Sequence, residues 1–562
     1  MANNSNTISL QNEQQTVEPQ NASVINYPLE FITDGMISDN TVSYSKAPKT
    51  SMSYIENMHN DVTGELRTRS EILDFPVSLP SAPTSVIFDD GGNTPGAGVS
   101  ITRTKKLLVQ CGADIVTFDP YSTSPTAVTT YTGISTGGYR LRYDKYQGRI
   151  IYASLNQSLG YIYSPASAWG TITGLTGIAT KTDLVSVGFY GMVWAASSQD
   201  NTCTLYNSDP ITTNLESATY STSSTLGAAA TKINFSNGDT ITAFAKTQNS
   251  LFLFSQNEIR RVFAPGQYDT TAVIQMGTPS QEAVVKTRVG YFFYNSNGVF
   301  FLNPSSDYSM PTADEVSFPI RDFIRRNVSS YSDILGWSDQ DCVYYQITTK
   351  IENNLLRTIV IRYNFVLKKW SIYSYSDKRF SAVYSQITAE DITTSGSQMN
   401  PITYLVGSKS TGSQYFASVF NDNLIEKGIT PSGFYNTQDV DSKPDNVFTN
   451  DPTQIRGTSI FFDGQTQWMD FDMPHVYKRI TGFYASHDLG SNAVMYIKYD
   501  RDDSPWVEVM NFDDKFVTTA RQTQTELFYR CKIRIAGNGR GTIKKFYNAG
   551  FFLVDYQGYD EA

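Results

Sequence analysis

The side chains most able to do chemistry in this chain are its three histidines, His59, His475 and His487. A serine-type hydrolase needs a histidine beside an acid and a nucleophile, and the chain carries no GxSxG turn to present such a serine. An HExxH segment is also missing, and no two histidines stand at the spacing of zinc ligands. We therefore expect each histidine to be a turn or surface residue.

A glycine-rich stretch, Gly537–Gly541, superficially resembles a phosphate-binding loop. A Walker A loop would continue into Gly-Lys-Ser/Thr at the start of a helix. Here Thr542-Ile-Lys-Lys-Phe-Tyr follows, and that segment reads as a strand. The stretch is therefore interpreted as a hairpin turn.

Two acidic clusters could bind calcium: Asp89 with Asp90, and Asp500 with Asp502 and Asp503. Neither places its oxygens at the offsets of the twelve-residue calcium loop, which also needs a terminal glutamate. Carboxylates are abundant enough for a glycoside hydrolase, but no pair stands out. The sequence thus predicts no catalytic, cofactor-binding or metal-binding residue, and no enzyme. A propeller glycosidase and a carbohydrate-binding propeller with exposed Tyr or Trp remain as alternatives.

Composition limits the classes of partner. The 562 residues carry a net charge of −10, and only 17% are charged, so the chain lacks the basic excess of a tight sequence-specific DNA binder. Its four cysteines, Cys111, Cys203, Cys342 and Cys531, lie far apart and are expected to be small buried hydrophobes. No signal peptide and no long apolar run is present, so we expect maturation in the cytosol and no membrane partner.

A strand–turn–strand unit recurs along the middle of the chain at intervals of roughly 45–55 residues. The five clearest copies are Leu141–Ala153, Val185–Ala195, Ile241–Phe254, Ala283–Tyr294 and Ile334–Tyr345. Repeats of this length made of short strands are typical of β-propeller blades. The enrichment in aromatic residues, 13% of the chain, also favours strands. We predict an all-β fold with a propeller of six or seven blades.

Helical periodicity is almost absent; the best stretch is Ile320–Asn327, about two turns long. The clearest hairpin has Asn295–Gly298 as its turn, between Tyr291–Tyr294 and Val299–Leu302. A late unit runs from Ile359 to Tyr373, and its Trp370 is expected to pack on a neighbouring sheet.

The predicted organisation has five parts. Residues 1–26 are a polar arm, disordered or ordered by a partner, and residues 27–80 are an extended platform whose hairpin closes the first blade. Residues 81–420 form the propeller, and the Pro-, Asp- and Asn-rich residues 421–455 form a linker or long loop. Residues 456–562 show alternating strands and are expected to form an antiparallel β-sandwich.

The segment Asn57–Arg69 resembles the start of hub, or nozzle, proteins of short-tailed bacteriophages. The matching residues are Asn57, Gly64, Leu66, Arg67 and Arg69. The Pro-Gly that commonly ends this motif is replaced by Ser70-Glu71. Further similar segments are Gly238–Lys246, Leu251–Val262, Gly277–Val285, Tyr291–Phe300, Lys369–Trp370 and Trp468–Ile480.

The resemblance implies a structural virion protein of the phage tail, assembled in the host cytoplasm. Members of this family form a ring, usually a homohexamer, below the portal and adaptor rings. They extend the DNA channel, retain the packaged genome and anchor tail fibres or spikes. An acidic chain would suit a channel along which DNA slides without sequence-specific binding.

Overall fold

The computed structural model describes the chain in segments, which fall into two compact units. The described residues are 24–27, 34–38, 48, 50–60, 65–69, 72–89, 92–94, 101–122, 124–146, 149–163, 168–175, 182–212, 215, 218–220, 230–303, 311–349, 358–375, 378–386, 402–409, 414–420, 461–471, 474–487, 493–500, 503–512, 518–522, 527–538 and 542–554. The predicted linker 421–455 and most of the arm 1–26 lie outside them.

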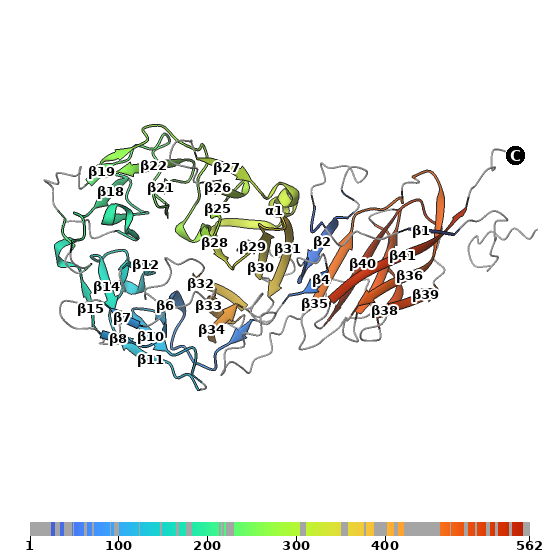
Figure 1. The fold of residues 1–562 in the computed structure, drawn as a ribbon, viewed down its shortest axis with the longest axis horizontal. Helices are drawn as coiled ribbons and strands as arrows, with labels where there is room; N and C mark the ends of the chain where they lie inside the picture. Colours follow the sequence, from blue (N-terminus) through green and yellow to red (C-terminus); the bar gives the residue numbers. More distant parts are fainter. Residues whose placement is uncertain are drawn as a thin grey trace, which may run out of the picture. The chain divides into compact units, whose positions relative to one another are not determined.

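The first unit to consider is the propeller, made of residues 71–368 and 375–439. Its described part contains six four-stranded antiparallel sheets, which Figure 1 shows around a common centre. The first three are β6 (Pro83–Asp89), β9 (Lys106–Cys111), β10 (Asp114–Phe118) and β11 (Val128–Tyr131); β12 (Arg142–Tyr146), β13 (Arg149–Ala153), β14 (Gly160–Tyr163) and β15 (Ala168–Thr171); and β16 (Leu184–Val187), β17 (Val193–Ala196), β18 (Thr204–Asn207) and β19 (Ala230–Lys232).

The next two sheets are β20 (Ala243–Lys246), β21 (Leu251–Phe254), β22 (Ile259–Ala264) and β23 (Gln267–Tyr268); and β24 (Val284–Thr287), β25 (Gly290–Asn295), β26 (Gly298–Asn303) and β27 (Thr312–Glu315). The last is β32 (Lys378–Gln386), β33 (Ile402–Lys409), β34 (Tyr415–Phe420) and β5 (Leu73–Asp74). Between the fifth and last sheets stand β28 (Val328–Ser338), β29 (Cys342–Thr349) and β30 (Thr358–Asn364), with β28 contacting both β24 and β32. A small hairpin, β7 (Gly92–Thr94) and β8 (Ile101–Arg103), completes the unit.

These sheets confirm the predicted propeller and its repeated units. All five strand–turn–strand segments are antiparallel pairs of consecutive strands. The predicted turn between Asn295 and Gly298 closes β25 and β26, which pair at those two residues. Gly298 has φ +142°, and a Cβ there would lie 2.1 Å from Ser317 Oγ, so only glycine suits this corner. The predicted short helix is α1 (Arg321–Asn327), and no described helix has the length and apolar character to cross a membrane.

The hydrophobic core is divided among the interfaces between neighbouring sheets. Trp194 of β17 and Leu253 of β21 belong to one buried cluster, which joins the third and fourth sheets. Phe254 of β21 and Phe293 of β25 have ring centroids 5.4 Å apart, which joins the fourth and fifth. A single four-stranded sheet has too little apolar surface to fold alone, so the blades stabilise one another.

The ring of blades is closed by chain from before the first blade. β5 pairs with β34, so Leu73 and Asp74 complete the last sheet rather than forming a platform outside the propeller. Phe75 then packs in one buried cluster with Phe118 of the first sheet and Tyr404 of the last, at centroid distances of 5.2 and 6.3 Å. The predicted boundary of the propeller at residue 81 was therefore too late.

The second unit joins three parts of the chain, residues 1–70, 369–374 and 440–562. One sheet has the order β3-β4-β41-β36-β39, with β1 also on β41, and the other contains β2-β35-β40-β37-β38, with β31 beside β2. The strands of the first sheet are β1 (Val24–Tyr27), β3 (Met58–Asn60), β4 (Leu66–Thr68), β36 (Tyr477–His487), β39 (Thr518–Gln522) and β41 (Thr542–Val554). Those of the second are β2 (Met52–Glu56), β31 (Lys369–Tyr375), β35 (Phe461–Thr466), β37 (Ala493–Tyr499), β38 (Val507–Phe512) and β40 (Cys531–Asn538).

This arrangement corrects three expectations. The hairpin of β3 and β4, whose turn Asp61–Gly64 lies outside the described residues, does not close the first blade, because β4 pairs with β41. The two strands of the expected late unit Ile359–Tyr373 are present as β30 and β31, but Lys369–Ser374 belongs to the second unit and not to the propeller. Of the predicted hairpin turn Gly537–Gly541, residues 539–541 lie outside the described residues, and the strands on either side belong to different sheets: β40 pairs with β35 and β37, whereas β41 pairs with strands of the other sheet. Apolar and polar residues alternate along a strand whichever sheet it joins, so the sequence could not reveal that β40 and β41 belong to different sheets.

Candidate ligand cavity in the propeller

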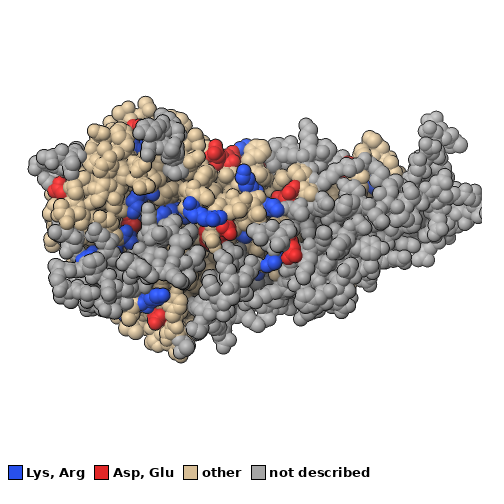
Figure 2. All heavy atoms as spheres, in the orientation of Figure 1, with Lys and Arg blue, Asp and Glu red and all other residues tan. Residues whose placement is uncertain are grey.

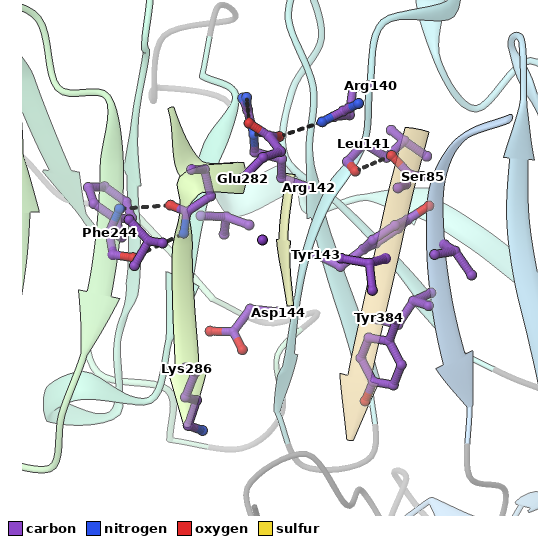
Figure 3. A pocket seen from close by; sticks show the side chains of 18 of the residues that line it. Ser85, Arg140, Leu141, Arg142, Tyr143, Asp144, Phe244, Glu282, Lys286 and Tyr384 are labelled. Carbon is purple, nitrogen blue, oxygen red and sulfur yellow. Dashed lines mark hydrogen bonds and ion pairs between the residues drawn. The ribbon is translucent and has the colours of Figure 1, made fainter. Parts of the chain in front are cut away.

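A cavity of about 350 Å³ lies at the centre of the propeller. Most of its lining residues come from β28 and from the first strands of the six sheets, β6, β12, β16, β20, β24 and β32, which places these strands around one axis. The others are Arg140 and Leu141 before β12, Gln281 and Glu282 before β24, and Tyr291 of β25. Figure 3 shows the charged side chains of Arg140, Arg142 and Glu282 at one end of the cavity, and those of Asp144 and Lys286 at the other end, together with the aromatic ring of Tyr384. Five basic and two acidic side chains line it, although the whole chain is acidic.

The arginine end is held by ion pairs that link distant parts of the chain. Glu282 receives hydrogen bonds from Arg142 Nε at 3.0 Å and lies 2.9 Å from Arg140 Nη1. Arg142 also pairs with Asp183, whose carboxylate accepts hydrogen bonds from the backbone N–H and hydroxyl of Ser198. Burial acts to raise the pKa of Glu282, but the two guanidinium groups outweigh it and hold that pKa far below its usual range. Glu282 is therefore ionised at neutral pH and cannot act as a general acid.

The lysine end is organised around Asp144 of β12. Its carboxylate accepts a hydrogen bond from Val187 N–H at 2.6 Å and lies 3.4 Å from Lys246 Nζ. Lys246 Nζ also donates to the carbonyl oxygen of Val187 at 2.6 Å. The ammonium group of Lys145, a buried side chain, lies 4.7 Å from the ring centroid of Tyr384, the geometry of a cation–π contact.

None of these side chains was predicted as a site residue. Arg142 and Glu282 are 140 positions apart in sequence and meet because β12 and the short 3-10 helix Gln281–Ala283, just before β24, border the same cavity. A usable signal did exist: Arg142, Asp144 and Lys145 make up three of the five residues of the first strand β12, and Lys286 lies in the first strand β24. Charges on an interior strand indicate either ion pairs or a ligand.

The residues that the sequence did single out lie elsewhere. His475 is exposed, as expected, but His59 is a buried residue of β3, so its placement on the surface or in a turn was wrong. Its Nδ1 lies 2.9 Å from the Tyr373 hydroxyl, and this hydrogen bond makes burial of the ring tolerable. All four cysteines are free and buried, which confirms their expected character.

The acidic clusters are explained as turn residues and strand ends. Asp500 Oδ1 accepts hydrogen bonds from the backbone N–H groups of Tyr529 and Arg530, at 2.9 and 3.0 Å. Asp89 is a buried residue at the end of β6. Asp90 and Asp502 lie outside the described residues, and among those described no group of three potential metal ligands is found.

The motif at Asn57–Arg69 forms a buried polar network in the second unit. Arg69 Nε donates to Asn57 Oδ1 at 2.9 Å, and Asn57 Nδ2 donates to Ser374 Oγ at 2.9 Å and to the carbonyl oxygen of Phe461 at 2.7 Å. Ser374 Oγ in turn donates to Glu56 Oε1 at 2.7 Å. Leu66 is buried in the same motif, whereas Arg67 is partly exposed and pairs with Glu65. Three chain segments far apart in sequence are thereby tied together.

Comparison with known proteins gives only distant similarity. No protein-family model matches the chain, and no curated protein matches it. Among solved structures, a chain of the "Crystal structure of Nidogen/Laminin Complex" is 11% identical with a TM-score of 0.30, over 48% of this chain and 97% of that one. A chain of "YCF48 bound to D1 peptide" is 9% identical with a TM-score of 0.36, over 63% of this chain and 96% of that one.

Proposed function

We propose that this chain is a structural virion protein, the ring-forming hub of a short phage tail. In this role a homohexameric ring would sit below the portal and its adaptor, extend the DNA channel and retain the genome until ejection. It would also anchor tail fibres or spikes. The β-propeller is a rigid scaffold that suits assembly, and the resemblance at Asn57–Arg69 supplies the class of assembly.

The observation that carries the proposal is the place of the motif residues in the fold. Asn57 and Arg69 lie at the centre of a buried network that includes Ser374 and Phe461. The motif residues therefore help to hold together a unit that is formed by both ends of the chain and by residues 369–374. Any protein with this construction would need residues such as Asn57 and Arg69 at these positions. The match of these residues to the motif of tail hubs therefore supports the proposal.

Surface charge is compatible with a channel wall. On the face drawn in Figure 2, basic and acidic side chains of the described surface are interspersed, and neither sign forms a broad patch there. Duplex DNA binds tightly where many lysines and arginines meet its phosphates. A surface of mixed charge on an acidic protein would let DNA pass with little adhesion.

The experiment is electron microscopy of the purified full-length chain, with mass photometry across a range of concentrations. A ring with a central channel and a mass that is a multiple of the protomer would support the proposal. A compact monomer at the highest concentration would contradict it. A portal gene beside the gene for this chain would be independent support.

A second candidate is a carbohydrate- or receptor-binding propeller of a fibre or adhesin. Two exposed aromatic residues favour it: Trp169 on β15 and Tyr190 between β16 and β17, with exposed fractions of 38% and 54%. Flat aromatic faces can stack on sugar rings. A glycan array would show binding by the wild-type chain that is lost in Trp169→Ala, whereas an array without signal would reject this candidate.

A further inference from the structure

We propose that Asn237 is a modification site, at which the side-chain amide is lost spontaneously and an aspartyl or isoaspartyl residue remains. Asparagine is one of the thermolabile residues of proteins. Asn237 is followed by Gly238, and a glycine leaves its own backbone nitrogen open to attack an adjacent side chain because it has no Cβ. The inference does not depend on ring formation or on a role in a virion.

The reaction needs no reagent other than water. The backbone nitrogen of Gly238 attacks Cγ of Asn237, a five-membered succinimide closes, and the side-chain nitrogen leaves as ammonia with the proton from the attacking nitrogen. Water then opens one of the two carbonyl groups of the ring. Opening at one carbonyl restores the ordinary main chain with an aspartate, and opening at the other gives isoaspartate, whose main chain is one carbon atom longer.

The surroundings of Asn237 allow this attack. Ser236 and Asn237 form a turn that precedes β20, and both Asn237 and Gly238 are exposed. A Cβ built on Gly238 would have nothing within 4 Å, so the peptide group has room to rotate. The Gly238 N–H donates to the carbonyl oxygen of Phe235 at 3.3 Å, which is longer than the usual range for such bonds. The attacking nitrogen is therefore weakly held and open to solvent.

The same tripeptide occurs a second time in a setting that blocks the reaction. Residues 296–298 are also Ser-Asn-Gly, but Gly298 is buried and pairs with Asn295 in the hairpin of β25 and β26. The Asn297 N–H donates to Asn295 Oδ1 at 2.8 Å, and a Cβ on Gly298 would collide with Ser317 Oγ. A succinimide at Asn297 can therefore form only after this corner of the hairpin opens.

Modification would change the charge and the length of a loop that is held on both sides of Asn237. Ser236 Oγ donates to Glu258 Oε2 at 2.7 Å, and Asp239 Oδ2 accepts a hydrogen bond from Asn257 Nδ2 at 2.9 Å. A new carboxylate at residue 237 would add a negative charge close to two acidic residues. Isoaspartate would also insert a main-chain atom between two fixed points, so we expect it to weaken the turn.

The test is to age the native full-length protein in mildly alkaline buffer and to follow both asparagines by peptide mass spectrometry. We expect Asn237 to lose its amide about tenfold or more faster than Asn297, because only Asn297 must wait for local opening. Asn297 is the matched control, since the two tripeptides are identical and belong to the same molecule. Ageing in denaturant should bring the two rates close together. An isoaspartyl methyltransferase should detect isoaspartate at residue 237.

Equal rates at the two asparagines in the native protein, or faster loss at Asn297, would overturn the proposal. An unchanged ratio of rates in denaturant would also overturn it, because the flanking sequence and not the fold would then set the rates. A product at residue 237 that contains aspartate alone would contradict the succinimide route and overturn the proposal as well.

Discussion

Arg69 donates a hydrogen bond from Nε to Asn57 Oδ1 over 2.9 Å, and the same oxygen accepts a hydrogen bond from Ser374 N–H at 2.8 Å. Asn57 adopts φ +54°, an uncommon value that asparagine tolerates better than most residues. This backbone conformation directs the Asn57 side-chain amide toward Ser374 and Phe461, so one side chain bonds to residues from three segments of the chain.

Replacing Arg69 should therefore destabilise the fold. Arg69→Ala removes one of the two described donors to Asn57 Oδ1 and a donor to the Ser374 carbonyl oxygen, both inside a buried network, and we expect a loss of about 3 kcal/mol in the free energy of unfolding. Arg67→Ala is the control on the same segment, because its partly exposed pair with Glu65 should be worth less than about 1 kcal/mol. Denaturant unfolding measures both, and similar losses for the two variants would contradict the architectural role of the network.

The closure of the propeller gives a second prediction. Lys378 Nζ lies 2.8 Å from Asp74 Oδ1, and their side chains are only 2% and 6% exposed. Asp74→Ala would leave a buried ammonium group unpaired beside the closing strand β5, at a cost of about 3–5 kcal/mol. Chemical denaturation should show the loss. The exposed pair of Arg288 and Asp341 provides the comparison, and Arg288→Ala should cost less than about 1 kcal/mol.

Stability should depend on pH through Glu282. Its pKa in the folded protein lies far below its ordinary value of 4.5, because Arg142 and Arg140 outweigh the effect of burial. Its contribution to stability is complete above pH about 4.5 and is lost as the pH falls toward the folded pKa. Glu282→Gln should be less stable than wild type at pH 7, and the difference should narrow in acid. Unfolding free energies measured from pH 7 to pH 3 check this, and a constant difference would contradict it.

The buried thiols should be unreactive in the folded protein. Burial raises the pKa of Cys111 to about 11, and it raises that of Cys531 further. The thiolate is the reactive form, so neither residue should react at pH 8 until the chain unfolds. Titration with an aromatic disulfide reagent, with and without denaturant, tests this. Rapid labelling of Cys111 or Cys531 in the native protein would show that its strand opens.

Much of the propeller was predictable because its information is local. Each blade repeats alternating apolar and aromatic residues with a turn between strands, and β25 with β26 illustrates how turn and strands agree. The closing strand β5 was not predictable, since two residues, Leu73 and Asp74, carry no pattern of their own. The same applies to Thr542–Val554, which alternates as any strand does and gives no clue about which sheet it joins.

The cavity was missed for a related reason. Charged side chains such as Lys145 and Lys286 on first strands were a signal in the sequence, but which of them share a cavity becomes clear only when the first strands of the blades surround one axis. The hydrogen-bond partners of buried polar residues could not be predicted either. Arg69 was noticed as part of a motif, but its partner Ser374 lies 305 positions away and has no distinguishing neighbours.

Under the proposed function a phage encodes this chain, and the most direct test is cryo-electron microscopy of that phage's intact virions, together with mass spectrometry of the purified particles. The account predicts that the chain is a virion component and that a ring of propeller-shaped densities lies beneath the portal and adaptor around the DNA channel. Particles that lack the chain, or a tail whose ring is built from another fold, would contradict it.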